Sequence, residues 1–562
     1  MMADLFTIPS VILITGALII PLLARTLRLI FAALLPLAGL ISVWNLDQPI
    51  ANNWLGLDVI IMQATKVGVL FATIFLILTF FGIIFSWVGI KKYELTGALL
   101  CSAGAVGVCL CGDFISLFIF WELMAISSCL IIFSGDSLKS MQAGMRYINL
   151  HILGGVILLA GIIGLHIETG NIALRMLHTE TWYTWLILSG FLLNAGAPPF
   201  SAWVSDAYPE ASPWGTVFLS AYTTKTAVFA LWVVFPGTFI LIPIGIYMIF
   251  YGIIYALLEN DIRRILTYSI INQVGFMIAA IGIGTELALN GSVAHASAHI
   301  IYKGLLLMSA GSVLYVTHKR KCTDLGGLYK GMRTTMICAL IGAISISAVP
   351  FTSGYISKEL ITQSSQDLQL MLVWLAFITG SAGVFLHAGI KYPWFVFFQD
   401  KLDKSESTTD APANMRIAMI AFSIICILLG VYPDLLYSAL PYELNFSPYT
   451  FDHTIPHMQL LIASGIAFFI MLPLMKRTLT ISLDFDWFYR KFGANLYSQT
   501  LRACRNCGQV LRIWSTNSLS RVLANLNHLH GEKGMFNRIA ATNIYAVITL
   551  LLLVAYLALF YS

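Results

Sequence analysis

The chain has 562 residues, of which 58% are hydrophobic and only 10% carry a charged side chain. Soluble globular domains average roughly 25% charged residues. The composition therefore excludes a soluble enzyme, a disordered protein and a nucleic-acid-binding protein. The 9 cysteines show no spacing typical of a disulfide framework. We expect a multi-pass membrane protein whose surface mostly faces the lipid bilayer.

Apolar runs long enough to cross a membrane as helices recur along most of the chain. A crossing takes about 20 residues, and in hydrocarbon a helix satisfies its own backbone polar groups. The runs lie near residues 8–24, 27–46, 68–89, 95–112, 113–134, 146–167, 183–199, 214–236, 238–258, 265–284, 292–316, 333–351, 368–390, 415–433, 457–474 and 541–561. Strict alternation, the mark of a transmembrane β-barrel, is missing. The sequence predicts an all-α polytopic membrane protein with about 14–16 transmembrane helices.

The loops between these runs alternate in charge. Loops after odd-numbered runs are basic, as with Arg263 and Arg264, whereas loops after even-numbered runs are acidic, as with Glu443. Because basic loops stay in the cytoplasm, we expect both termini on the outer side. The loop after the seventh run is an exception, since Asp206 and Glu210 make it an acidic inner loop.

Residues 476–540 are too polar to cross the membrane. They hold ten Lys or Arg against three Asp or Glu, and Leu519, Val522 and Leu526 recur at helical spacing. This pattern predicts a basic amphipathic helix on the cytoplasmic side, along the membrane or along neighbouring subunits; a solvated basic loop is the alternative. Cys504 and Cys507 form a lone CxxC, which is too weak a signal for a zinc site. We expect no bound metal.

Several titratable residues lie inside apolar runs, where a charge costs at least ~2.5–3.5 kcal/mol. Three of them, His295, His299 and Lys303, recur every four residues and so share one helix face. Imidazole exchanges protons near neutral pH, and an apolar site favours the neutral form of a lysine. A row of such groups predicts a proton pathway, whereas histidines that merely hydrogen-bond neighbouring helices are the structural alternative. The predicted pathway comprises Glu122, Lys225, His295, His299, Lys303, Lys358 and Lys391.

Two segments interrupt the apolar pattern. One starts at Asn194 and contains Pro198 and Pro199; the other contains Pro350 and Gly354. Proline removes a backbone donor and opens a helix, and discontinuous helices in corresponding halves indicate an ion path. The breaks fall five runs apart. They predict two inverted five-helix repeats with broken helices seven and twelve; a kink for packing is the alternative for either break alone.

These features divide the chain into six predicted parts. They are the N-terminal helices 1–94, a first five-helix repeat 95–236, a second five-helix repeat 237–391, C-terminal helices 392–475, the basic amphipathic segment 476–540 and a final transmembrane helix 541–562.

Six motifs together resemble one family. They are FWELM around Glu122, PPFSAWVSDAYPEAS at 198–212, FLSAYTTKTAVFAL at 218–231, DIRRILTYSIINQVGFM at 261–277, HASAHIIYKGLLLMSAG at 295–311 and SGYISKE at 353–359. They resemble the proton-conducting membrane transporter family, which includes antiporter-like subunits of respiratory complex I, related membrane hydrogenase subunits and the large subunits of Mrp-type Na+/H+ antiporters. The resemblance covers roughly residues 65–435. With DFDWFYRK at 484–491, it is nearest to the D-type subunits of bacterial antiporters.

The resemblance implies fourteen core helices in two inverted repeats, with buried Glu, Lys and His side chains along the midplane. It implies that Glu122 is the family's fifth-helix glutamate and Lys225 its eighth-helix lysine. It likewise implies that His295, His299 and Lys303 form the central row and that Lys358 is the terminal lysine.

This sequence departs from the family pattern at two positions. The family's seventh-helix lysine, the partner of the fifth-helix glutamate, is Asn194 here, and a histidine of the following stretch is Ser201. Asparagine forms hydrogen bonds but carries no proton charge. Either Lys225 pairs with Glu122 instead, or the first half-channel is altered or silent.

Three functions fit these observations. The first is the proton-translocating subunit of a multisubunit Na+/H+ antiporter in a bacterial inner membrane, with H+, Na+ or another monovalent cation, and other membrane subunits as partners. The second is a proton-pumping subunit of an NADH–quinone oxidoreductase or membrane hydrogenase. The third is a structural subunit with a decayed channel. The sequence holds no redox-cofactor motif, so we expect no cofactor and no intrinsic catalysis.

Overall fold

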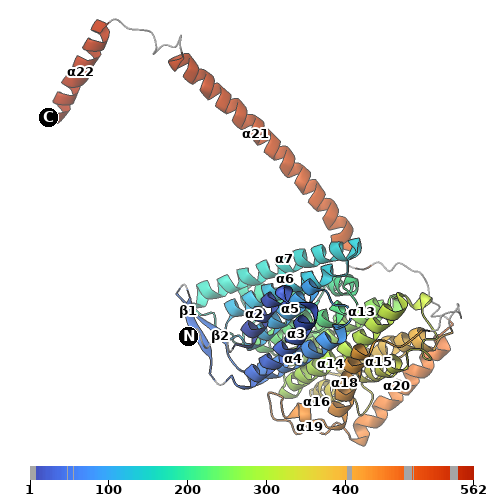
Figure 1. Cartoon of the computed structure of the whole chain (residues 1–562). Coiled ribbons are helices and arrows are strands. Elements are labelled where there is room, and N and C mark those ends of the chain that lie inside the picture. The colour runs from blue at the N-terminus through green and yellow to red at the C-terminus, as the bar shows by residue number, and fades with distance from the viewer. Residues whose placement is uncertain are drawn as a thin grey trace. The chain divides into compact units, whose positions relative to one another are not determined.

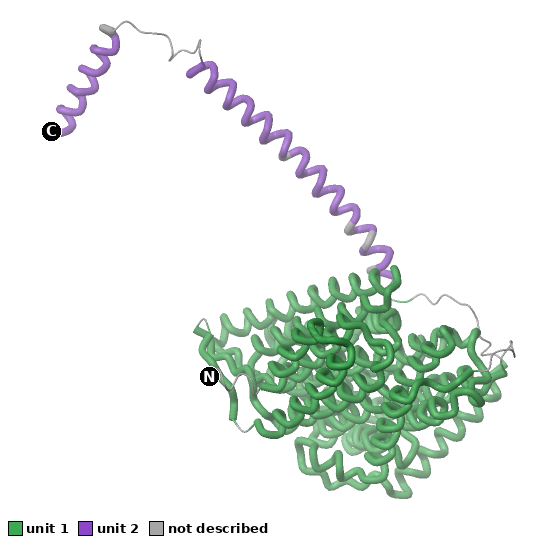
Figure 2. The backbone as a smooth tube through the Cα atoms, viewed as in Figure 1, with its two compact units in different colours: residues 1–486 green, residues 487–562 purple. Residues whose placement is uncertain are grey.

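The computed structural model describes residues 8–46, 48–54, 56–400, 408–473, 484, 487–531 and 542–561. The chain forms two compact units, residues 1–486 and 487–562 (Figure 2). Within the described residues, 12 helices are long and apolar enough to cross a membrane, and three shorter apolar helices accompany them. The predicted polytopic helical fold is therefore confirmed.

The first unit begins with helices that pack side by side (Figure 1). They are α2 (Pro9–Ile19), η1 (Ile20–Leu22), α3 (Arg25–Trp44), α4 (Lys66–Ser86), α5 (Lys92–Leu110), α6 (Phe114–Phe133) and α7 (Leu138–Thr169). Between α3 and α4 lies an antiparallel hairpin of β1 (Ile50–Trp54) and β2 (Leu57–Met62). The sequence did not predict this hairpin, because β1 is polar and mostly exposed.

The middle of the chain supplies the centre of the bundle. It comprises α8 (Trp182–Ala195), α9 (Trp203–Ala207), η2 (Tyr208–Glu210), α10 (Gly215–Leu219), α11 (Thr223–Val234), α12 (Leu241–Leu258), α13 (Ile262–Ile283) and α14 (Glu286–Thr317). Every residue of α13 from Ile265 to Gly282 is buried. Close packing explains this, since a Cβ atom on Gly245 of α12 would lie 2.5 Å from the carbonyl oxygen of Gly275.

The remaining elements of the first unit enclose α14. They are η3 (Cys322–Asp324), α15 (Arg333–Ile346), α16 (Ser353–Asp367), α17 (Met371–Val384), the π-helical segments η4 (Phe385–Lys391) and η5 (Trp394–Phe398), α18 (Ala413–Val431), α19 (Asp434–Tyr437) and α20 (Phe451–Met471). Helix α14 packs against α13, α15, α16 and α18. Most of its 32 residues are buried, the polar ones in its middle included, as expected for a helix enclosed by others.

Both predicted helix breaks are present. Helix α8 ends at Ala195, just after Asn194, and α9 begins at Trp203 beyond Pro198 and Pro199. Helix α15 ends at Ile346, and α16 begins at Ser353 beyond Pro350. Gly354 lies in the first turn of α16, where a Cβ atom would collide with the carbonyl of Ser345.

A third break, between α10 and α11, was not predicted. Residues 220–222 leave the helix between Leu219 and Thr223, although the surrounding sequence contains no proline or glycine at that point. The relation of the two halves as inverted repeats remains a prediction.

The second unit contains η6 (Phe488–Gly493), α21 (Ala494–His530) and α22 (Thr542–Tyr561). The structure shows α21 as a helix of 37 residues, so the alternative of a solvated loop is wrong for this stretch. The histidines nearest to the CxxC along this helix include His528, 21 residues after Cys507; at about 1.5 Å per residue the two lie about 30 Å apart and do not share a metal ion. The predicted segment 476–540 begins and ends in residues outside those described.

Candidate proton pathway

Lys225 lies immediately after the unexpected break between α10 and α11. Its side chain is fully buried, and its Nζ atom donates to the carbonyl of Ser220 at 2.7 Å and to the Oγ1 atom of Thr224 at 3.0 Å. Residue 220 has left the helix, so its carbonyl is free to accept from a side chain. The break therefore supplies the polar partner that a lysine needs at this depth.

Two further lysines use the same arrangement. The Nζ atom of Lys358 donates to the carbonyl of Ile346, the last residue of α15, at 2.9 Å. The Nζ atom of Lys391 donates to the carbonyls of Leu257 and Glu259, both at 2.6 Å, at the end of α12. Helix ends leave carbonyls without an intrahelical partner, and these carbonyls stabilise the buried ammonium groups.

The central row on α14 is fully buried. Lys303 donates through Nζ to the Oγ atom of Ser269 at 2.9 Å. His295 contacts Gln273 through Nε2, at 3.1 Å from Oε1, and Ser357 through Nδ1, at 3.0 Å from Oγ. Because Ser357 precedes Lys358, the row on α14 meets the lysine at the second predicted break.

His299 differs from its neighbours, because neither ring nitrogen has a hydrogen-bond partner among the described residues. Its ring packs against that of Tyr302, with centroids 5.3 Å apart. The structural alternative of a hydrogen-bonded histidine accounts for His295 and leaves His299 unexplained.

The lysines of the row have no acidic partner. Within the described parts of the chain, no carboxylate lies at ion-pair distance from Lys225, Lys303 or Lys358. A buried charge without a counterion is costly. When one of these lysines loses its proton, the interior therefore loses an unpaired positive charge. No carboxylate loses its partner in that step.

Sequence reasoning missed His387, which extends the row. It is fully buried in η4, four residues before Lys391, and its Nδ1 atom contacts the Gly383 carbonyl at 2.8 Å. The signal available in the sequence is the motif HAGIK, in which a histidine and a lysine at i and i+4 share a helix face.

Glu122 lies apart from this row. It belongs to α6, and its carboxylate lies against α7. Its Oε1 atom is buried without a hydrogen-bond partner in the described chain, and a Cβ atom on Gly155 of α7 would collide with it. Of the two alternatives given for this position, a direct pairing of Glu122 with Lys225 is not made between the described side chains.

The two departures from the family pattern, Asn194 and Ser201, are both buried. The Nδ2 atom of Asn194 donates to the carbonyl of Gly190 at 3.1 Å, and it would be 3.6 Å from a Cβ atom on Gly154. Asn194 Oδ1 and Ser201 Oγ are buried without partners among the described residues. Glu122 and Asn194 thus lie beside two consecutive residues of α7, Gly155 and Gly154, without contacting each other directly.

A cluster of ion pairs explains the acidic inner loop. Arg146 of α7 binds Asp206 through two hydrogen bonds of 2.7 and 2.9 Å. Arg320 contacts Glu210 at 2.9 Å and Asp261 at 2.6 Å. The basic residues come from loops predicted to lie on the same side, so the acidic loop is neutralised by its neighbours. Burial raises the pKa of the Asp261 carboxyl, against the opposing effect of Arg320.

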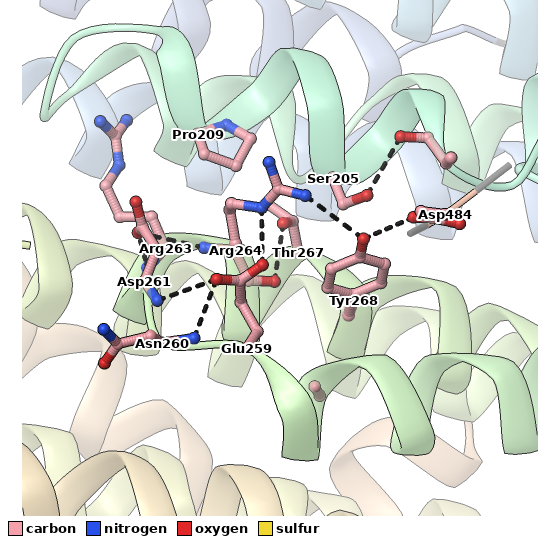
Figure 3. A network of polar contacts seen from close by, with 12 residues as sticks. Ser205, Pro209, Glu259, Asn260, Asp261, Arg263, Arg264, Thr267, Tyr268 and Asp484 are labelled. Atoms are coloured by element: carbon pink, nitrogen blue, oxygen red, sulfur yellow. Dashed lines mark hydrogen bonds and ion pairs between the residues drawn. The ribbon is translucent and has the colours of Figure 1, made fainter. Parts of the chain in front are cut away.

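Figure 3 shows the adjoining part of this cluster. Arg264 donates to Glu259 at 2.8 Å and reaches the hydroxyl of Tyr268 at 3.4 Å. Tyr268 and Tyr251 both donate to Asp484. Asp484 opens the motif DFDWFYRK, and these hydrogen bonds attach the start of that motif to α12 and α13.

Residues 111–385 match the family described as "NADH:quinone oxidoreductase/Mrp antiporter, TM". The match covers nearly half of the chain. Among curated relatives, it is 25% identical over 374 residues to the D-type Na(+)/H(+) antiporter subunit of Alkalihalophilus pseudofirmus, a match that covers 63% of this chain and 75% of the relative. It is 26% identical over 391 residues to hydrogenase-4 component B of Escherichia coli, covering 62% of this chain and 57% of that protein.

Two solved structures share the fold. A chain of the Mrp complex from Dietzia sp. DQ12-45-1b has a TM-score of 0.70 at 19% identity and covers 78% of this chain and 96% of its own length. A chain of the membrane-bound sulfane sulfur reductase, an archaeal respiratory membrane complex, has a TM-score of 0.71 at 23% identity, covering 98% of this chain and 99% of its own. The family resemblance inferred from the motifs is therefore confirmed.

Proposed function

We propose that the chain is the proton-translocating subunit of a multisubunit monovalent cation (Na+)/H+ antiporter in the inner membrane of a bacterium. The observation that carries the proposal is the buried row of proton-exchanging side chains, which stays within the bundle from Lys225 through α14 to Lys358. Its members are Lys225, His295, His299, Lys303 and Lys358, with His387 and Lys391 as an extension. Burying titratable side chains of this kind costs free energy, so they do not stabilise the packing of the bundle.

Protons move along this row by hopping between imidazole and amine groups through trapped water. The Nζ atoms of Lys225 and Lys358 exchange hydrogen bonds between water and helix-end carbonyls. A movement at the breaks in α10/α11 and α15/α16 changes these contacts and with them the proton affinity of each lysine. The exchange of Na+ in a neighbouring protein of the complex is coupled to that movement.

The surface around Glu122 supports the presence of partner subunits. Ile119 and Ile126, one turn before and after it on α6, are 51% and 58% exposed. The Oε1 atom of Glu122 is buried without a hydrogen-bond partner among the described residues, which is unfavourable. A neighbouring subunit that covers this face and supplies a cation or donor completes the site.

A second candidate is a proton-pumping subunit of a redox-linked complex, such as an NADH–quinone oxidoreductase or a membrane hydrogenase. One observation favours it. The fold shared with the sulfane sulfur reductase chain extends over 98% of this chain, whereas the fold shared with the Mrp complex chain covers 78%. The longer match includes the region of α21 and α22.

The test uses the native complex, purified and reconstituted into vesicles with a pH-sensitive dye. A pulse of NaCl that moves protons supports the antiporter. Proton movement that needs an electron donor and acceptor, and ignores Na+, supports the redox-linked complex. No proton movement under either condition refutes both and leaves a structural subunit with a decayed channel.

A further inference from the structure

A second group of titratable side chains lies beside the row, on α16 and α20. Glu359 follows Lys358 on α16 and is 7% exposed. The Nδ1 atom of His457 lies 3.6 Å from its Oε1 atom, and the Nδ1 atom of His453 lies 3.7 Å from its Oε2 atom. The two histidines of α20 thus flank a single carboxylate. The sequence-based pathway included none of these three residues.

His457 connects this group to the end of the row. It is 6% exposed, and its Nε2 atom has no hydrogen-bond partner within the described chain. Its ring packs against that of Tyr355, with centroids 5.5 Å apart. Tyr355 lies three residues before Lys358 on α16, close to the break where Ile346 accepts from Lys358. An imidazole can accept a proton at one nitrogen and release another from the second.

His453 connects the same group to a cavity. The cavity has a volume of about 480 Å³, and His453 lines it together with the acidic residues Glu286, Asp367 and Glu443. These acids lie at the start of α14, at the end of α16 and in the segment before α20. All three segments follow even-numbered runs, whose loops are predicted to face the outer side. Acidic walls concentrate protons and other cations.

We propose that Glu359, His453 and His457 form a gate that connects Lys358 with this cavity and releases protons to the outer side. The inference rests on the proposed function. Lys358 gives a proton to Nε2 of His457, which passes its Nδ1 proton to Glu359. The carboxyl gives that proton to His453, and His453 gives one to water in the cavity. Each step moves one proton, and a return of the imidazole to its first tautomer restores the gate.

The distances distinguish this group from a structural ion pair. Arg146 and Asp206 hold two helices together at 2.7 Å. Both His–Glu distances are longer than a hydrogen bond, although both lie within ion-pair range. A side-chain movement of about 1 Å brings either contact within hydrogen-bond range. Proton transfer requires such a side-chain movement, whereas the same movement weakens a contact that only holds two helices together.

The first test measures proton transport by the reconstituted complex. Glu359→Gln keeps the size of the side chain and removes its titration, so we expect transport to fall about 10²-fold, as for loss of a positioned proton-transfer group. Ser364→Ala is the matched control, because its hydroxyl bonds to the carbonyl of Ile361 within α16. Both variants should keep the thermal midpoint of the wild-type complex, whereas a structural role for Glu359 would lower it in the glutamine variant alone.

The second test does not depend on transport. Gln363 lines the cavity, so Gln363→Cys should react with a membrane-impermeant maleimide added from the outer side, above the background of the native cysteines. Ile462→Cys, which replaces an apolar residue 56% exposed on α20, should not react. Reaction of Gln363→Cys from the inner side alone, or from neither side, overturns the outward gate.

The two proposals fail in different ways. A complex that transports protons while Glu359→Gln keeps the wild-type rate refutes the gate and leaves the proposed function. A complex that moves no protons under any condition refutes the proposed function and the gate together, whichever side labels the cavity.

Discussion

His299 offers the sharpest perturbation of the row. Its imidazole is fully buried and has no hydrogen-bond partner among the described residues. A buried polar group without a partner costs about 1–3 kcal/mol. His299→Leu removes that cost and fills a similar volume, so the thermal midpoint of the complex should stay unchanged or rise. A histidine kept for packing or helix contacts would give the opposite result.

Proton transport by His299→Leu should fall, although its thermal midpoint stays unchanged or rises. Without His299, the row on α14 has a gap of eight residues between His295 and Lys303, which is about 12 Å along a helix. Several ordered waters would have to bridge that gap, and an apolar side chain leaves no site for them. We expect proton transport to fall by about 10²–10⁴-fold, the range for loss of a positioned proton-transfer group.

The assay is dye quenching in vesicles that contain the wild-type complex or a variant in equal amounts. Ser297→Ala is the matched control, because Ser297 is also buried on α14 without a hydrogen-bond partner in the described chain. His299→Gln separates polarity from titration and should be nearly as slow as His299→Leu. Wild-type transport by His299→Leu would refute the pathway through α14.

Four further outcomes follow. Glu122→Gln should abolish proton-linked transport in vesicles while the complex still assembles, as judged by gel filtration. Lys303→Ala should do the same, since it removes the amine between His299 and His387. Gly155→Ala should slow transport in the vesicle assay, because the new Cβ atom collides with the Glu122 carboxylate; an unchanged rate would show that this carboxylate need not lie against α7. Arg146→Ala should lower the thermal midpoint, because the 4% exposed Asp206 side chain loses the two hydrogen bonds that Arg146 donates to it, and Arg146→Ala with Asp206→Asn should recover part of the loss.

The membrane helices could be predicted because their signal is local. A run of apolar residues needs no knowledge of its neighbours, and the prolines after Asn194 and at Pro350 mark breaks wherever they occur. The break before Lys225 carries no such mark. It becomes visible only when the carbonyl of Ser220 is found to bind Nζ of that lysine.

The candidate site divides in the same way. The spacing of His295, His299 and Lys303 on one helix predicts a shared face, so that part could be derived from sequence. Glu359 and His457 lie almost a hundred positions apart, and no rule of spacing joins them. The acidic exception at Asp206 likewise needed the structure, because its partner is an arginine on another helix.

The arrangement of the lysines bears on the loss of the family's seventh-helix lysine. Lys225 and Lys358 each donate a hydrogen bond to a carbonyl freed by a helix break. Each of these two breaks thus supplies the hydrogen-bond partner of one lysine. The break after α8 has no lysine, and Asn194 binds within its own helix instead. Glu122 is the one acidic member of the predicted pathway and, like His299, has a buried polar atom without a partner among the described residues. If a neighbouring subunit supplies that partner, the first half-channel is completed by assembly, and proton entry is confined to the assembled complex.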